Sequence, residues 1–296
     1  MSWSSKYEGL ISCVGIEYPE KDFVSLKSTH SLRLATYRFH VNQPKALVFV
    51  FHGLHKASSD MALVARVLFQ NGFAVAAFDQ EGQGDSEGQR GTMVDIDDQV
   101  ADCIQFIEKT KLMYPANVPV FCIGVTLGGA LCVKIGLKRP DLLNGVVLYG
   151  PTLELDPNFN PFIQKTVRLL NWCCCKNLRL KAVDQSANSQ NPHYASYCYD
   201  NPGFFSGKLN VKTAYAIIRG LRELKPQLER FKCPFILFHG EKDKMKGASS
   251  SAEFCDKCQA VDKEIVLYPE MNHAVVHEPE FKEILQKTVD WIRNRS

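Results

Sequence analysis

The chain has 296 residues, of which 45% are hydrophobic and 23% charged, and its formal net charge is +3. These values exclude a largely disordered chain, and the length fits a single α/β domain that carries an insertion. The small net charge and the lack of long Lys/Arg blocks argue against nucleic-acid binding.

The N-terminal residues show no basic start followed by a long apolar run, so we expect neither a secretory signal nor a transit peptide. No window approaches the length of a transmembrane helix. The 11 cysteines are scattered through the chain rather than set in a short framework. This distribution predicts reduced thiols, no disulfides and a cytoplasmic location.

Short apolar runs alternate with helical patterns in the first half of the chain. Residues 46–53, 73–79 and 119–125 have the near-continuous hydrophobicity of strands that are buried on both faces. Residues 60–72 and 95–113 have helical periodicity, and the second stretch begins with acidic residues, which the helix dipole favours there. This alternation predicts a parallel sheet.

The same pattern resumes in the second half, with strands at 143–150, 233–240 and 264–270 and a closing helix at 278–294. Between residues 151 and 209 the alternation lapses, and Asn, Pro, Ser, Cys and aromatic residues accumulate. We therefore expect one core, formed by residues 1–150 and 210–296, with an insertion at 151–209.

The central motif is Gly124-Val125-Thr126-Leu127-Gly128-Gly129, which follows the strand at 119–125 and precedes a helical stretch at 130–138. A sharp strand-to-helix turn that presents a side-chain oxygen needs glycines two residues before and two residues after the nucleophile. The motif therefore predicts a nucleophile elbow with Thr126 at its tip. A glycine-rich turn that only packs tightly is the structural alternative.

The acid and the histidine of a catalytic triad should follow the nucleophile in that order, each just beyond a strand end. Asp243 lies three residues past the strand at 233–240, and His273 follows the strand at 264–270. A lone Asp or His in a loop is usually only solvated. Matching residue types in the expected order at successive strand ends are hard to obtain by accident, so we predict a triad of Thr126, Asp243 and His273.

Ester hydrolysis also needs donors aimed at the oxyanion, and these are usually backbone N–H groups. The candidates are the N–H of Leu127, which follows the nucleophile, and the N–H of Leu54 in the loop His52-Gly53-Leu54. We expect His52 to support this loop rather than to act as a base, since His273 already takes that place.

Together these motifs resemble the monoacylglycerol lipase family, also known as serine aminopeptidase-like hydrolases or lysophospholipases. They are His52-Gly53-Leu54, Asp79-x-x-Gly82-x-Gly84-x-Ser86-x-Gly88, the elbow, His239-Gly240-x-x-Asp243 and Asn272-His273. The resemblance spans about Leu32 to Ile292. It implies an α/β-hydrolase fold, with a mostly parallel central sheet flanked by helices and an apolar cap inserted after the strand at 143–150.

By the same resemblance, Thr126 is the nucleophile, His273 the general base and Asp243 the residue that orients it, while Leu54 and Leu127 supply the oxyanion donors. The implied substrates are acyl esters such as monoacylglycerols and lysophospholipids, with no cofactor and no metal. We therefore expect a carboxylic ester hydrolase that acts on single-chain acyl lipids.

The sequence departs from the family at the nucleophile. The family elbow usually reads Gly-His-Ser-Met-Gly-Gly, whereas here Val125 and Thr126 replace the histidine and the serine. A threonine hydroxyl can attack an ester, but a strained elbow disfavours β-branched residues and the extra methyl crowds the acyl carbon. The loops after Gly53 and Asp79 also differ from the family pattern. The alternative is an impaired or inactive hydrolase that serves as a binding or structural component of a larger assembly.

The predicted insertion has two segments of different character. Residues 161–181 are apolar and basic together, which fits an interfacial or palmitoylated patch as well as a cap helix over an acyl tunnel, and both allow transient membrane contact. The cysteines at issue are Cys173, Cys174 and Cys175. The aromatic residues that follow either line an acyl pocket or pack in the core: Tyr194, Tyr197, Tyr199, Phe204 and Phe205.

Cys255 and Cys258 form a lone CxxC pair within a helical stretch. No second pair or clustered histidine completes a zinc site, so we expect one face of a helix there. The sequence identifies no protein partner.

Overall fold

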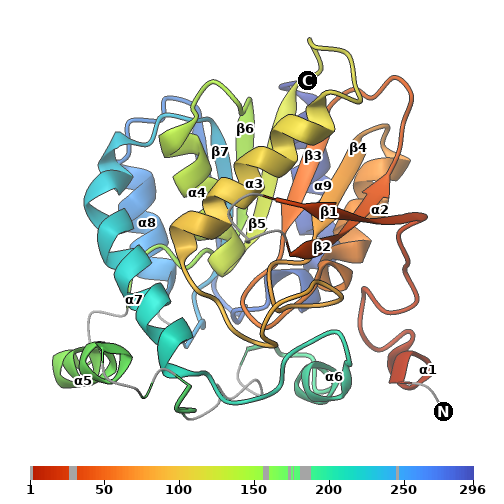
Figure 1. The fold of residues 1–296 in the computed structure, drawn as a ribbon. Coiled ribbons are helices and arrows are strands. Elements are labelled where there is room, and N and C mark those ends of the chain that lie inside the picture. Colours follow the sequence, from red (N-terminus) through yellow and green to blue (C-terminus); the bar gives the residue numbers. More distant parts are fainter. Residues whose placement is uncertain are drawn as a thin grey trace.

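The computed structural model describes residues 3–26, 32–155, 160–172, 175, 177–180, 188–244 and 247–296. These residues form a central sheet of eight strands in the order β1-β2-β4-β3-β5-β6-β7-β8 (Figure 1). The strands are β1 (Glu20–Ser25), β2 (Arg33–Phe39), β3 (Leu47–Phe51), β4 (Ala74–Phe78), β5 (Val120–Val125), β6 (Gly145–Tyr149), β7 (Phe235–Gly240) and β8 (Lys263–Tyr268). The pairs β1–β2 and β2–β4 are antiparallel, and the other neighbouring strands are parallel. The predicted α/β class with a mostly parallel sheet is confirmed.

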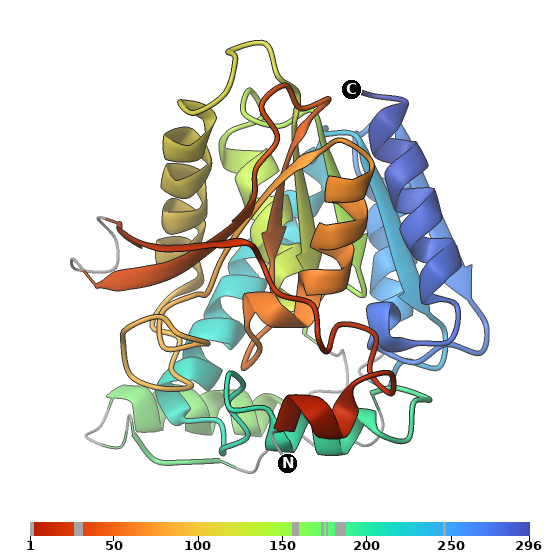
Figure 2. The ribbon, with the colours of Figure 1, turned by 90° about the vertical axis from the view of Figure 1, so that its right-hand side faces the viewer.

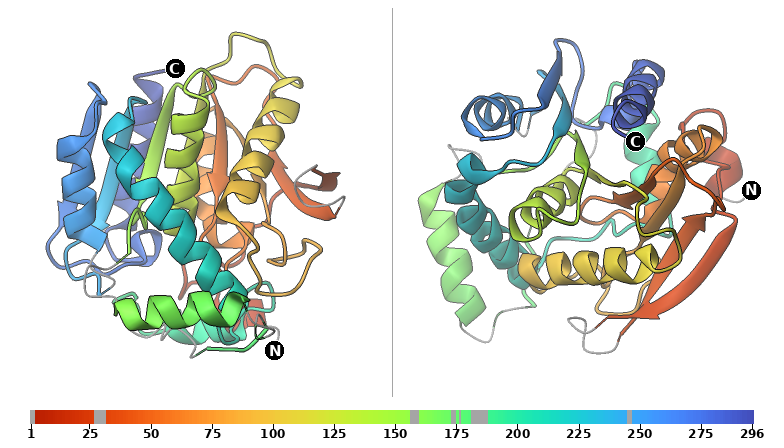
Figure 3. Two further views of the ribbon diagram at one scale, coloured as in Figure 1. Left: turned by 60° about the vertical axis from the view of Figure 1, so that its left-hand side comes forward. Right: turned by 90° about the horizontal axis from the view of Figure 1, so that it is seen from above.

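Helices cover both faces of the sheet (Figure 3). They are α1 (Trp3–Tyr7), α2 (Ala62–Gln70), α3 (Ile96–Lys111), α4 (Leu127–Lys138), α5 (Pro161–Trp172), α6 (Tyr194–Asp200), α7 (Val211–Leu224), α8 (Gly247–Lys257) and α9 (Phe281–Arg293). Three short 3₁₀ helices are η1 (Ser58–Met61), η2 (Lys225–Arg230) and η3 (Val275–His277). Helices α3, α4 and α8 pack on one face of the sheet, and α2 and α9 pack on the other.

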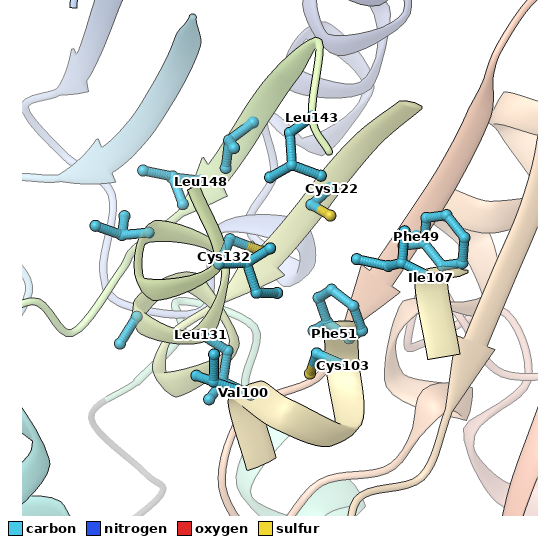
Figure 4. Packing of buried hydrophobic residues seen from close by; sticks show 14 of the residues in the cluster. Phe49, Phe51, Val100, Cys103, Ile107, Cys122, Leu131, Cys132, Leu143 and Leu148 are labelled. Carbon is cyan, nitrogen blue, oxygen red and sulfur yellow. The ribbon is translucent and has the colours of Figure 1, made fainter. Parts of the chain in front are cut away.

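The core strands are buried on both sides because their side chains alternate between these two layers. In β5, Val120 and Cys122 belong to the cluster under α3 and α4, whereas Phe121 and Ile123 belong to the cluster under α2 and α9. Figure 4 shows the first cluster, where Cys122 lies close to Cys132 of α4. Burial on both faces explains the continuous apolar runs in the sequence.

Two strands were not predicted. Strand β1 is the outermost strand of the sheet and is mostly exposed, and its sequence EKDFVS is largely polar. Such an edge strand has no continuous apolar run, so it cannot be recognised by the pattern that identifies the buried strands. Strand β2 pairs with β4 in an antiparallel arrangement, which the parallel reading of the sequence did not include.

The segment between β6 and α7 contains α5 and α6 and, among its described residues, no strand beyond one isolated bridge between Arg179 and Asn210. Helices α1, α5 and α6 all lie beyond the end of the sheet where β5 ends and α4 begins, with α5 on the opposite side of the molecule from α1 (Figure 1). Helix α5 packs against α7 through Val167, which contacts the cluster of Val211, Ala214 and Ile218. The predicted unit 151–209 stays a prediction, because its boundaries are not tested.

The N-terminal residues lie against α6 (Figure 2). Tyr7 donates a hydrogen bond from its hydroxyl to Asp200 Oδ2 at 2.7 Å, and Lys6 forms an ion pair with the same carboxylate at 2.6 Å. Ile11 and Cys13 join a buried cluster with the aromatic residues of α6. Tyr7, Ile11 and Cys13 therefore tie this segment to the folded core. Within the described residues, no helix is both long enough and apolar enough to cross a bilayer.

Candidate active site

Thr126 lies at the turn between β5 and α4 in a strained backbone conformation. Its φ is 53° and its ψ is −112°, and it is one of two described non-glycine residues with positive φ. A β-branched residue in this region is a clear outlier, since its side chain crowds its own backbone. Strain of this kind persists where the surrounding structure enforces it, which is typical of functional sites.

Glycines allow the tight turn around Thr126. A Cβ added to Gly124 would lie 2.3 Å from the carbonyl oxygen of Gly128, and one added to Gly128 would lie 2.1 Å from the carbonyl oxygen of Phe51. The start of α4 can therefore approach the ends of β5 and β3 only without these side chains. Gly129 lies against Pro151, and Gly53 leaves space beside the Thr126 side chain.

The three predicted triad residues lie within hydrogen-bond distance in the expected order. Thr126 Oγ1 is 2.9 Å from His273 Nε2, and His273 Nδ1 is 2.8 Å from Asp243 Oδ2. Because a carboxylate only accepts hydrogen bonds, Nδ1 carries the proton toward Asp243 and Nε2 accepts from the threonine hydroxyl. Asp243 follows β7 and His273 follows β8, so both lie in loops at the carboxyl ends of the parallel strands.

Asp243 also accepts a second hydrogen bond, which the sequence did not predict. His239 Nε2 lies 2.8 Å from the same oxygen, Oδ2. Burial raises the pKa of this carboxyl, but the hydrogen bonds from His239 and His273 outweigh burial and hold the pKa of Asp243 below its ordinary value. Asp243 is therefore ionised at neutral pH. A histidine four residues before the acid was the only sequence signal for this contact.

The two predicted oxyanion donors border the same pocket as Thr126. Leu127 opens α4 and Leu54 follows β3, and neither backbone N–H donates to another described residue. First-turn N–H groups of a helix have no intrahelical acceptor, which leaves Leu127 free to bind an anion.

His52 is buried in the loop before Leu54, and both of its ring nitrogens are engaged. Nδ1 is 2.8 Å from the carbonyl oxygen of Gly53, and Nε2 accepts the backbone N–H of Gln80 at 3.0 Å. Burial lowers the pKa of His52, so the ring is neutral. The ring joins the loop after β3 to the loop after β4.

An apolar pocket lies over Thr126 and His273. Four of the five aromatic residues proposed for it line the pocket: Tyr194, Tyr199, Phe204 and Phe205. Tyr197 does not. Its ring packs against Tyr7, and its hydroxyl lies 3.1 Å from Cys13 Sγ. The described residues of α5 do not line the pocket, whereas Phe204–Gly207 and, on α7, Ile217 do. The prediction of a cap helix over an acyl tunnel is not tested by this and stays a prediction.

The pocket also contains charged residues. Lys56 Nζ lies 2.7 Å from Cys198 Sγ and 4.5 Å from the centre of the Phe204 ring. Asp60 Oδ1 lies 3.1 Å from His277 Nε2. Burial raises the pKa of Asp60, but the positive charge of Lys56 and the contact with His277 outweigh burial. The pKa of Asp60 is therefore lowered to about 2.

Two groups among the described residues each bring together three side chains that can bind a metal: His239 with Asp243 and His273, and Cys13 with Asp60 and His277. In the first group, hydrogen bonds join both imidazoles to the carboxylate. In the second, the Lys56 charge acts on Asp60 and would oppose a cation.

The nine described cysteines have free thiols. Cys255 lies in α8 and Cys258 just after it, both buried. Cys175 is exposed, whereas Cys173 and Cys174 lie outside the described residues.

The family model described as serine aminopeptidase, S33, matches residues 42–280. Monoglyceride lipase of Homo sapiens is 28% identical over 247 residues, which cover 79% of this chain and 81% of that protein. The crystal structure of Paleococcus ferrophilus monoacylglycerol lipase matches with a TM-score of 0.79 and 24% identity, covering 89% of this chain and 99% of that chain.

A soluble variant of monoglyceride lipase from Saccharomyces cerevisiae, solved with a substrate analog, matches with a TM-score of 0.81 and 19% identity. The match covers 96% of this chain and 97% of that chain. These structures share the α/β-hydrolase fold. Because the family model spans well over half of the sequence, the chain belongs to the serine aminopeptidase, S33, family of α/β-hydrolases.

Proposed function

We propose that the protein is a carboxylic ester hydrolase that acts on single-chain acyl lipids through Thr126, His273 and Asp243. The observation that carries the proposal is the unbroken hydrogen-bond chain from Thr126 Oγ1 through His273 to Asp243, with spacings of 2.9 and 2.8 Å, beneath an apolar pocket. Monoglyceride lipases among the relatives support an acylglycerol ester as the substrate class.

In the first step, Thr126 Oγ1 attacks the ester carbonyl while its proton moves to His273 Nε2. The N–H groups of Leu54 and Leu127 donate to the oxyanion that forms on the carbonyl oxygen. Collapse breaks the ester bond, and His273 gives its proton to the departing alcohol. Water, deprotonated by His273, then attacks the acyl-threonine, and its collapse releases the fatty acid and restores the Thr126 hydroxyl.

The extra methyl of Thr126 slows this chemistry relative to serine. A displacement of the reacting atoms of about 1 Å can lower a rate roughly a hundredfold. Because the Thr126 backbone has a positive φ, the methyl cannot move away without adding strain. We therefore expect measurable but slow hydrolysis by the native chain.

The test is labelling of the purified protein with a fluorophosphonate, combined with hydrolysis of a monoacylglycerol. Native protein is expected to label, Thr126→Ser to label faster, and Thr126→Ala not to label. Thr152→Ala is the matched control, because Thr152 lines the same pocket and its side chain is not part of the triad. Mass spectrometry should place the adduct on Thr126.

An inactive hydrolase that serves as a binding component is the second candidate. The β-branched Thr126 at φ 53° favours it, since the same methyl that slows attack can stop it. In that case native protein stays unlabelled under all conditions. If Thr126→Ser restores labelling, one methyl silences an intact site. If Thr126→Ser is also inert, the binding role replaces the enzymatic proposal.

We also propose that α5 touches membranes transiently while substrate is taken up. The helix exposes Phe162 and Trp172, which are 74% and 84% accessible, next to Lys165 and Arg168. Apolar and basic residues on one helix are typical of contact with an anionic lipid surface. The role of residues 151–209 as a separate cap belongs to this proposal.

A further inference from the structure

Two imidazoles share one oxygen of the triad carboxylate. Asp243 Oδ2 lies 2.8 Å from His273 Nδ1 and 2.8 Å from His239 Nε2. His239 is located in β7 and is fully buried, so it touches neither the pocket nor solvent. The ring takes no part in the proton transfers, and its contact with Asp243 supplies a hydrogen-bond donor to a buried carboxylate, which would lose that donor if an apolar residue replaced His239.

The hydrogen bonds fix the protonation of His239. Because a carboxylate only accepts hydrogen bonds, the ring carries its proton on Nε2. His239 Nδ1 lies 2.8 Å from Ser251 Oγ on α8 and accepts the serine hydroxyl. Both ring nitrogens are therefore satisfied in the neutral form. A Cβ at Gly247 would lie 2.7 Å from His239 Cε1, so α8 presses closely on the ring.

We propose that His239 is a positioning residue for the triad: it fixes the Asp243 carboxylate toward His273 and takes up part of the negative charge that acts on His273. This inference rests on the proposed function. Ser251 and Gly247 hold the His239 ring, and the ring in turn holds Oδ2. Asp243 thus has two fixed donors on one oxygen, which leaves its side chain little rotational freedom.

The sign of the electronic effect follows from charge sharing. An ionised Asp243 stabilises the protonated His273 ring that forms during attack, and a second donor on the same oxygen weakens that stabilisation. Without His239, more of the carboxylate charge acts on His273, which then binds its proton more tightly. A more basic His273 stays protonated up to a higher pH. Below that pH it cannot accept the proton of the Thr126 hydroxyl.

The other titratable groups near His273 stay unchanged in this comparison. Lys56, Asp60 and His277 line the same pocket as His273. The residues of α8 that face His239, Ser251 and Gly247, are neutral. A change at position 239 therefore alters the donors to Asp243 and the acceptor of the neutral Ser251 hydroxyl, and it removes no other charged group.

The experiment is an NMR titration of the His273 ring in the full-length chain, with His239→Leu and His239→Gln compared against native protein. We expect the His273 midpoint to rise by about 0.5 to 1 unit in His239→Leu, as loss of one buried hydrogen bond implies. His239→Gln should restore the native midpoint, because its amide N–H₂ reaches the place of Nε2. If hydrolysis is measurable, the acid limb of kcat/KM should move upward with the midpoint while KM stays constant.

Two further variants keep the test decisive. If His239→Leu does not fold, His239→Asn replaces it, because its amide nitrogen corresponds to Nδ1 and falls short of Asp243. Ser250→Ala is the control on α8, since Ser250 donates to Gly247 O and not to His239. An unchanged midpoint in a folded His239→Leu or His239→Asn, or an equal shift in His239→Gln, overturns the inference.

The titration separates this inference from the proposed function. The midpoint of His273 is measured without substrate, so a shift that Gln reverses supports charge sharing even if no variant hydrolyses an ester. Hydrolysis without any shift supports the proposed function and removes His239 from its machinery.

Discussion

At the scale of single residues, the backbone of Thr126 offers a stability test that does not depend on activity. At most positions a protein with alanine is more stable than the same protein with glycine, because glycine loses more conformational freedom on folding. At φ 53° and ψ −112° the order reverses, since only glycine adopts this region without strain. We predict that the free energy of unfolding of the Thr126→Gly variant is about 1–3 kcal/mol higher than that of the Thr126→Ala variant. Urea denaturation measures this difference.

The matched pair for this comparison lies on α7. Arg222 is exposed within the helix. There Arg222→Gly should be less stable than Arg222→Ala by about 0.5–1 kcal/mol. If alanine is the more stable residue at both positions, the strain at Thr126 is absent in solution.

At the scale of elements, a buried network joins η1, η3 and the N-terminal segment. Asp60 of η1 lies 3.1 Å from His277 Nε2 of η3 and 3.5 Å from the Tyr197 hydroxyl of α6. That hydroxyl in turn contacts Cys13. Side chains from distant parts of the sequence therefore meet at one carboxylate.

This network predicts acid sensitivity. The pKa of Asp60 falls from its ordinary 3.8 to about 2 in the folded chain. A depressed carboxyl pKa stabilises the fold above the unfolded value, and this stabilisation is lost as the pH falls from about 4 through about 2. We predict that Asp60→Asn lowers the unfolding free energy at pH 7 by about 2 kcal/mol and flattens its decline over this pH range, measured by chemical denaturation.

The control is Asp256→Asn on the exposed side of α8, which should change neither the stability at pH 7 nor its acid dependence. If Asp60→Asn keeps the native acid profile, another group causes the decline. Asp243, whose pKa is also depressed, is the next carboxyl to test.

The strands that are buried on both faces could be predicted from the sequence, whereas the exposed edge strand β1 and the short helix α6 could not. Strands such as β5 carry continuous apolar runs because helices cover both of their sides. The edge strand β1 is polar and exposed. Helix α6 reads YASYCYD, and its buried residues have helical spacing, but seven residues are too few to establish a period in the sequence. Their conformations depend on partners that lie far away in the sequence, such as Tyr7 for α6.

The same reasoning applies to the site. Thr126, Asp243 and His273 could be located because each follows a strand end within a recognisable motif. His239 lies within the buried strand β7, where the sequence pattern predicts only a core position. Its contact with Asp243 depends on the bend of the chain after Gly240, and the four-residue spacing between the two side chains does not by itself establish that bend. For Tyr197 the sequence leaves both a pocket position and a core position open, and its contact with Cys13 places it in the core.

At the scale of the whole molecule, exposed apolar side chains gather at one end. Helix α5 and the residues after it expose Phe162, Leu169, Trp172 and Leu178 beyond the sheet edge that carries the site. The formal net charge of +3 adds a weak general attraction to anionic surfaces. This end of the molecule would place the pocket next to the lipid that supplies the substrate.

We predict that replacing Phe162 and Trp172 together by serine lowers binding to vesicles with anionic lipid about tenfold or more, because two large apolar side chains no longer enter the interface. Binding of native protein should also weaken as salt rises, since Lys165 and Arg168 flank the apolar residues. Vesicle sedimentation measures both effects. Leu112→Ser with Val261→Ser is the matched control, because these side chains are 87% and 98% exposed and precede β5 and β8 at the opposite end of the sheet. Equal losses in the two double variants would mean that general hydrophobicity, rather than the α5 surface, governs binding.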